Sequence, residues 1–217
     1  MTTLTRPAAQ PACHRESRIT KSLLGYGVLA GPVYVTVSLA QALSRAGFDP
    51  ASQPWSLLSN GALGWIQITN FVLTGLMTGA LALGLHRAGT GRWLPRLIGG
   101  YGVSLIAAGV FRADPVPGFP PGTAAAAVSW HGMLHLVCGS AGFLCLIAAC
   151  LAAGRAAGRS GARGWALFSR VTGIVFLAAF AGIASGSPVA TLPFTAAVIL
   201  AAGWLTALSV RCYRAAA

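Results

Sequence analysis

Six long apolar segments alternate with short polar segments along this chain of 217 residues. At about 1.5 Å of rise per helical residue, about 20 residues cross a hydrocarbon core of about 30 Å. Backbone groups in lipid must be hydrogen-bonded within the segment, which favours α-helices. The pattern therefore predicts an all-α polytopic membrane protein, a bundle of six transmembrane helices with spans at 22–44, 65–85, 94–111, 132–153, 165–184 and 189–210.

The remaining segments are short. Residues 22–211 form one transmembrane domain, whereas residues 1–21 are predicted to be a disordered basic tail and residues 212–217 a C-terminal tail. The first span also resembles a signal peptide, because basic residues precede it and Ala40-Gln41-Ala42 fits a cleavage site. Pro32 and the length of the span favour a retained anchor, and cleavage is the alternative.

The composition excludes a soluble globular protein. Hydrophobic residues make up 55% of the chain and charged residues only 8%, against about 25% charged residues in a soluble domain. The formal net charge of +12 is typical of nucleic-acid binding, but the basic residues lie in short runs between apolar spans and form no continuous face. Membrane lipids are therefore the expected partners, and no nucleic acid is expected.

The basic residues also predict the orientation. The two termini and the second and fourth connections, with Arg170 one turn inside the fifth span, carry 13 of the 15 basic residues, whereas the first and third connections carry Arg45 and Arg112. By the positive-inside rule both termini and both tails are cytoplasmic. We expect a multi-pass protein of the cytoplasmic (inner) membrane.

The spans are rich in glycine, which lets helices approach closely in lipid. Gly75-Leu-Met-Thr-Gly79 matches the small-residue pattern of such contacts. The sequence leaves open whether the chain also forms homo-oligomers.

Polar side chains gather on the side opposite the arginines, in the predicted outer loops and the outer parts of the second and fourth spans. This distribution predicts an extracytoplasmic polar site. Its candidate residues are Ser56, Ser59, Asn60, Asn70, Asp114, His131 and His135.

One chemical interpretation of this site is a metal-dependent membrane hydrolase. His131 and His135 are four residues apart and would share a helix face, and Asp114 could supply a third zinc ligand. Bound zinc would activate water, with Ser56 or Ser59 as oxyanion donor or nucleophile. The simpler interpretation places the histidines at the membrane interface and Asp114 in a turn, so no cofactor is expected and zinc is the alternative.

A small-solute transporter is the third interpretation, because polar groups within spans often mark solute paths. Asn70 and Gln67 lie about one turn apart in the second span. However, no acidic residue lies within any predicted span, and interhelical hydrogen bonding is the commoner role of such amides.

Two groups of motifs resemble a known family. They are Trp55-Ser-Leu-Leu-Ser-Asn-Gly61 with Gly64-Trp-Ile-Gln-Ile-Thr-Asn-Phe71, and Gly109-Val-Phe111 with Asp114-Pro115, Gly118-Phe-Pro120 and 131–135. They resemble bacterial and archaeal integral membrane proteins grouped as domain of unknown function 998. The resemblance implies six helices and carries no established activity. The leading prediction is a non-enzymatic membrane protein that binds a lipid or small ligand at its extracytoplasmic face.

Overall fold

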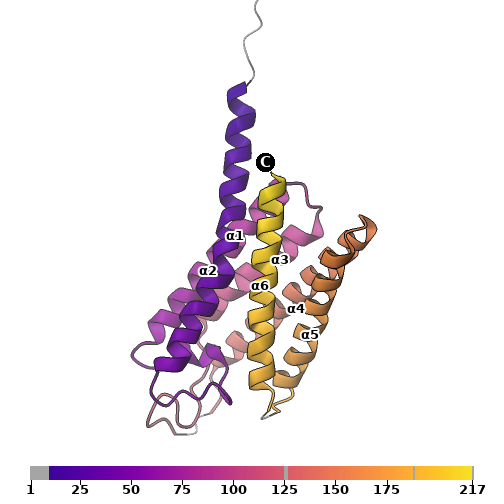
Figure 1. Ribbon diagram of the computed structural model, residues 1–217. Coiled ribbons are helices and arrows are strands. Elements are labelled where there is room, and N and C mark those ends of the chain that lie inside the picture. Colours follow the sequence, from indigo (N-terminus) through magenta and orange to yellow (C-terminus); the bar gives the residue numbers. More distant parts are fainter. Residues whose placement is uncertain (1–9, 125–126, 188, 217) are drawn as a thin grey trace, which may run out of the picture.

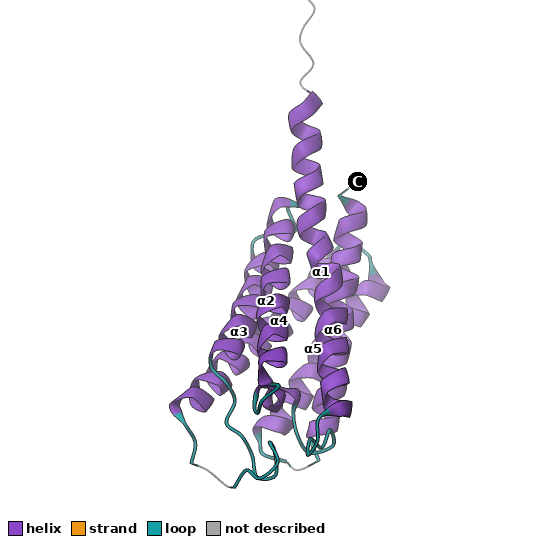
Figure 2. Cartoon of the chain, turned by 90° about the vertical axis from the view of Figure 1, so that its left-hand side faces the viewer, coloured by secondary structure: helices purple, strands orange, loops and turns teal. Residues whose placement is uncertain are grey.

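The structure is a computed structural model that describes residues 10–124, 127–187 and 189–216, with side chains from Ser17 onward. Six α-helices and one 3-10 helix account for most of these residues (Figures 1 and 2). The only β pairing in the described ranges is an isolated bridge between Val116 and Phe119. The elements are α1 (Gln10–Ser44), η1 (Trp55–Ser59), α2 (Gly64–Arg87), α3 (Trp93–Val110), α4 (Trp130–Arg159), α5 (Arg163–Ala184) and α6 (Thr191–Ala215).

The predicted fold class is confirmed, because all six helices are long and apolar enough to cross a membrane. Most helix ends lie within two residues of the predicted bounds, and three lie farther from them. α1 begins at Gln10, so residues 10–21 are helical and not a disordered tail, while residues 1–9 lie outside the described chain. Pro11 suits the first helical turn, where its missing N–H costs nothing. α4 and α6 continue through arginine and alanine, which are strong helix formers, beyond the predicted apolar limits.

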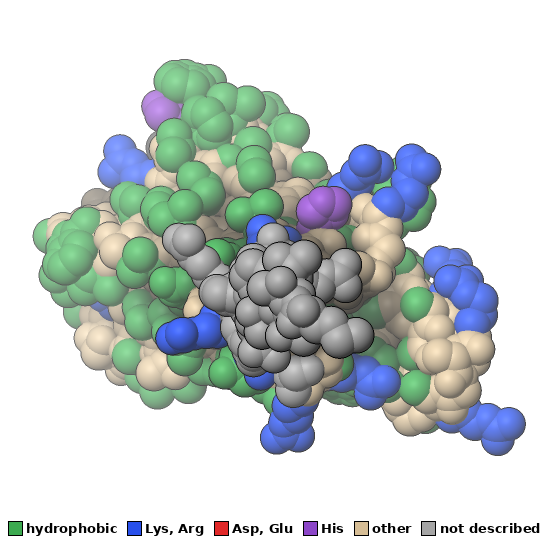
Figure 3. All heavy atoms as spheres, turned by 90° about the horizontal axis from the view of Figure 1, so that it is seen from above, with side chains coloured by type: hydrophobic (Ala, Val, Ile, Leu, Met, Phe, Trp, Pro, Cys, Tyr) green, Lys and Arg blue, Asp and Glu red, His purple; other side chains and the backbone are tan. Residues whose placement is uncertain are grey.

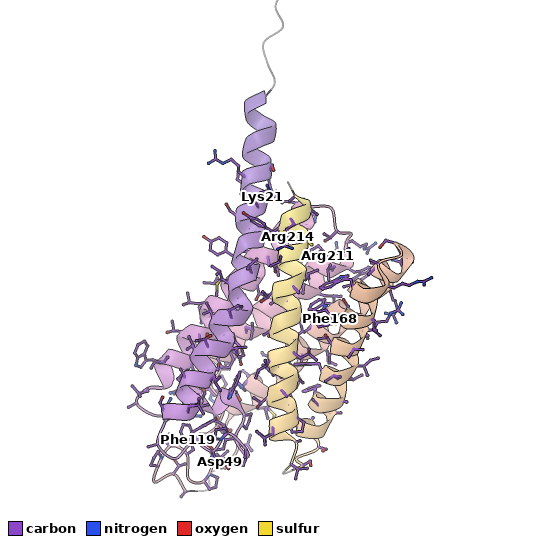
Figure 4. All side chains as sticks on the ribbon, viewed as in Figure 1. Lys21, Asp49, Phe119, Phe168, Arg211 and Arg214 are labelled. Atoms are coloured by element: carbon purple, nitrogen blue, oxygen red, sulfur yellow. The ribbon has the colours of Figure 1, made fainter. Side chains whose placement is uncertain are left out.

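The six helices form a closed ring. Each helix packs against its neighbours in sequence, and α6 packs back against α1. The described start of α1, the C-terminus and the α2–α3 and α4–α5 connections lie at one end, called here the arginine end (Figure 1). The α1–α2, α3–α4 and α5–α6 connections lie at the opposite end, the loop end. Figure 4 shows Lys21, Arg211 and Arg214 near the arginine end and Asp49 and Phe119 at the loop end.

Glycines allow close helix contacts at several points of the ring. A methyl group on Gly31 of α1 would lie 2.5 Å from the backbone oxygen of Ala202 on α6. On α4, a methyl group on Gly142 would overlap the side chain of Ser104 on α3. Backbone approach of this kind is how helices associate in lipid, where no hydrophobic force drives them together.

The loops at the loop end are packed and closed over the bundle. Phe48 and Phe119, from the first and third connections, meet edge to face with ring centroids 5.1 Å apart. Arg45 donates hydrogen bonds to the backbone oxygens of Leu58, at 2.9 Å, and Asn60, at 2.6 Å. Its guanidinium also lies 5.2 Å from the centroid of the Phe119 ring. The one arginine of the first connection therefore ties the two loops together.

Candidate functional site

A cavity lies inside the ring near the loop end. It has a volume of about 340 Å³, and α1 to α6 and η1 all contribute to its wall. Most of the lining is aromatic or aliphatic, and hydroxyl groups and one imidazole supply the polar part. The residues that line it include Tyr34, Trp55, Ser56, Phe71, Tyr101, Ser104, His135, Leu136, Gly139, Ser140, Phe143, Phe176, Phe180, Ile183, Ala184, Phe194, Thr195 and Val198.

Helical spacing places these side chains on the inner faces. On α4 the lining residues are His135, Leu136, Gly139, Ser140, Phe143 and Leu146, whose three- and four-residue intervals place them on one helix face. Gly139 keeps room free, because a methyl group there would meet no atom within 4 Å.

An aromatic cluster from α4, α5 and α6 forms part of the wall. The ring of Phe143 packs edge to face against Phe176, Phe180 and Phe194, with centroids 5.3–5.4 Å apart. α4, α5 and α6 thus share one aromatic surface in the bundle. A surface of this kind favours hydrocarbon over water.

The cavity reaches the outer surface of the bundle. Leu136 on α4 is 62% exposed although it lines the cavity, and Ala184 at the end of α5 is also exposed. Both helices are long and apolar enough to lie in a membrane. The opening beside these residues therefore faces the region that lipid occupies around the bundle.

His135 is a buried polar residue of the wall, with 7% of its surface exposed. Its Nδ1 lies 2.8 Å from the backbone oxygen of Phe111 and 3.2 Å from that of Ala108. Ala108 lies in the last turn of α3 and Phe111 is the C-cap residue that follows it, a region where carbonyls lack helical partners. Carbonyl oxygens only accept, so Nδ1 carries a proton and donates it to them. His135 therefore closes the end of α3 and is also part of the cavity wall.

The three site residues predicted in the first connection, at positions 56, 59 and 60, have different surroundings. Ser56 lines the cavity, whereas Ser59 is 1% exposed and donates its hydroxyl to the backbone oxygen of Ser56 at 2.8 Å. Asn60 donates to the backbone oxygens of Leu57 and Ala113, each at 3.1 Å. Asn60 thus links the first connection to the third, Ser59 is hydrogen-bonded within η1, and neither residue lines the cavity.

Asn70 belongs to a buried polar network between α1 and α2. Its Nδ2 donates to the backbone oxygen of Tyr34 and to the hydroxyl of Ser38, each at 3.1 Å. Gln67, which is fully buried, accepts from Nε2 of Gln41 at 2.8 Å. Tyr34 lines the cavity, so Asn70 supports the wall from behind. The interhelical role of both amides agrees with the simpler interpretation of the sequence.

Asp114 joins the third connection to the start of α4. Its carboxylate accepts the backbone N–H of Ser129 at 2.8 Å and also accepts the Ser129 hydroxyl. Ser129 in turn accepts the N–H of Gly132 at 3.0 Å, which makes it the N-cap of α4. The hydrogen bonds from Ser129 hold the pKa of Asp114 below its usual value, and the nearby His131 and His135 lower it further.

The structure does not assemble the zinc site that the spacing suggested. His131 is exposed and lies against Trp130, with ring centroids 3.7 Å apart, whereas His135 faces α3 and Asp114 binds Ser129. Within the described residues, no group of three or more His, Cys, Asp or Glu side chains is placed to hold a metal ion. Of the seven candidates, only Ser56 and His135 line the cavity.

The aromatic wall was not predicted from the sequence, because the predicted site consists of polar residues. Phe143, Phe176 and Phe194 lie within the predicted spans and line the cavity. The usable signal was the glycine and serine pair at 139 and 140 on the same helix face as Phe143. Small residues beside large aromatics leave space that neighbouring helices do not fill.

No curated protein and no solved structure matches the chain. The sequence model of the family described as Protein of unknown function (DUF998) matches residues 28–211, a range that includes every residue of the cavity wall. The chain therefore belongs to the DUF998 family.

Proposed function

We propose that this protein binds one lipid-like amphiphile in the loop-end cavity and does not transform it. The observation that carries the proposal is the aromatic cavity of about 340 Å³ inside a bundle of six apolar helices. Its volume lies within the range of about 300–1,000 Å³ typical of small-molecule sites. With both termini in the cytoplasm, the cavity lies toward the outer face of the cytoplasmic membrane.

The distribution of polar groups supports an amphiphile with a compact head. Ser56, His135 and Ser140 line the cavity with hydroxyl groups and an imidazole, while the Phe143 cluster offers only apolar surface. A head that forms hydrogen bonds fits these polar groups, and the hydrocarbon part fits against the phenylalanines. The opening beside Leu136 and Ala184 gives such a molecule a path from the lipid.

Binding without catalysis is supported by how the reactive groups are engaged. Both carboxylate oxygens of Asp114 accept hydrogen bonds from Ser129, and the Ser59 hydroxyl is turned to the backbone of η1. Nδ1 of His135 is held by backbone carbonyls and not by a carboxylate, unlike the base of a hydrolytic triad. Transport is less favoured, because the two acidic side chains that the structure describes lie in loops and not in spans.

A cavity-filling variant tests the proposal. Leucine at position 139 would place its side chain in the cavity, whereas Gly203→Leu adds the same atoms to an exposed face of α6, where a methyl group likewise meets nothing within 4 Å. We expect Gly139→Leu to lower the affinity for a fluorescent fatty acid by about tenfold or more, because the leucine side chain removes several contacts between the ligand and the cavity wall. The affinity is measured in detergent micelles. The amount of co-purified lipid, measured by mass spectrometry, should fall in parallel.

The control should behave like the natural chain in both measurements. Equal probe affinity and equal co-purified lipid in Gly139→Leu and Gly203→Leu would overturn the assignment of the cavity. So would a natural chain that neither retains lipid nor binds the probe.

A further inference from the structure

A second hollow lies at the arginine end, between the last turns of α4 and the first turns of α5. It has a volume of about 530 Å³ and shares no residue with the loop-end cavity, so its ligand does not depend on the ligand proposed there. Four arginines and three small or apolar residues line it: Arg155, Gly158, Arg159, Arg163, Ala166, Leu167 and Arg170.

Helical spacing and a glycine bring the four guanidinium groups to one place. Arg155 and Arg159 are four residues apart on α4 and share a face, while Arg163 and Arg170 are about two turns apart on α5. α5 lies close against α4 because Gly154 has no side chain. A methyl group there would lie 2.7 Å from Cγ of Arg170, whose stem therefore crosses directly onto α4.

No carboxylate balances these charges in the part of the chain that the structure describes. Asp49 and Asp114, the two acidic side chains described, lie in loops at the opposite end and bind their own loop residues. Figure 3, which views the arginine end, shows Lys and Arg side chains around the rim and no acidic side chain among those visible. Elsewhere at this end Arg211 lies over the ring of Trp165, at 5.7 Å.

Four cations around one hollow repel one another and attract an anion. Guanidinium groups bind phosphate oxygens in bidentate geometry, which suits an arginine cluster to a phosphate group. The apolar part of the lining indicates what the phosphate is attached to. Leu167 is 65% exposed beside the arginines, on a helix long and apolar enough to lie in a membrane. We propose that this hollow binds the headgroup of an anionic phospholipid, with its acyl chains along Leu167.

The test compares two double variants that remove the same charge. Arg159→Gln/Arg163→Gln removes two arginines of the hollow, whereas Arg18→Gln/Arg214→Gln removes two exposed arginines of α1 and α6 at the same end. The full chain in detergent is titrated with phosphatidylglycerol or phosphatidylcholine, and bound lipid is counted by native mass spectrometry. Thermal unfolding in the same detergent verifies that both variants fold.

We expect phosphatidylglycerol to bind more tightly than phosphatidylcholine, and Arg159→Gln/Arg163→Gln to lower its affinity by about tenfold through the lost charge-assisted hydrogen bonds. The control should change it by less than about twofold, since exposed distant charges are screened. Equal losses in both variants would show attraction to net charge only and overturn the site. Equal binding of the two lipids would overturn it as well. Displacement of phosphatidylglycerol by inorganic phosphate would overturn the assignment to a lipid.

Discussion

Replacing Gly75 with alanine is expected to destabilise the bundle, whereas the same replacement at Gly79, one turn later on α2, is not. A methyl group on Gly75 would lie 2.6 Å from the backbone oxygen of Gly102 and 2.6 Å from the side chain of Ile106 on α3. Ordinary van der Waals contact begins at 3.4 Å, so the overlap with a backbone atom is about 0.8 Å. A methyl group on Gly79 meets no atom within 4 Å.

The comparison isolates packing, because both variants share the helix-propensity gain of up to about 1 kcal/mol that alanine has over glycine. Overpacking a close contact costs about 1–3 kcal/mol. We therefore expect Gly75→Ala to be less stable than Gly79→Ala by about 1–3 kcal/mol. The assay is unfolding in mixed micelles of dodecylmaltoside and increasing SDS, followed by tryptophan fluorescence. Equal stabilities, or a less stable Gly79→Ala, would refute the packing of α2 against α3.

Two further predictions concern the loop end and the orientation. Hydrogen bonds from Ser129 lower the pKa of Asp114. The Asp114 carboxylate therefore stabilises the fold at pH values above the unfolded pKa of about 3.9. This contribution is lost as the pH falls through the folded pKa. Asp114→Asn should therefore be less stable than the natural chain at pH 7 and approach it below about pH 4 in thermal unfolding, and a difference that stays constant with pH would contradict this. In cells producing a variant without its native cysteines, Pro117→Cys should react with an impermeant maleimide and Ser160→Cys only after lysis. The reverse pattern would invert the orientation.

The sequence was sufficient to predict the helices because the bilayer imposes their length and internal hydrogen bonding. The largest difference from the prediction is at the start of α1, because the polarity of residues 10–21 predicted a disordered segment and the structure has a helix there. Polarity excludes a residue from the lipid, but it does not prevent a helix from continuing into water. Alanine, glutamate, arginine and lysine in this segment all favour a helix.

The histidine pair shows why the candidate site was only partly predictable. His131 and His135 are four residues apart, as a shared helix face requires, yet one is exposed and the other buried. The difference comes from the neighbouring helix. α3 ends at Val110, and the backbone oxygen of Phe111 binds His135, so His131, one turn earlier on α4, lies beyond the end of α3. Spacing within one helix cannot reveal where its neighbour stops.

α4 and α5 contribute residues to both hollows, although the other helices also line the loop-end cavity. Methyl groups on Gly154 and Gly173 would lie 3.1 Å from the backbone oxygen of Ala166 and from Cβ of Cys150, respectively, so the two helices are in close contact along this stretch. Toward the loop end α4 and α5 contribute phenylalanines to the cavity, and toward the arginine end they contribute guanidinium groups to the second hollow. The two spaces share no lining residue, so Gly139→Leu is a control for phospholipid binding and Arg159→Gln/Arg163→Gln is a control for the cavity. A loss of both activities in either variant would mean that the pair had separated, and not that one site had been removed.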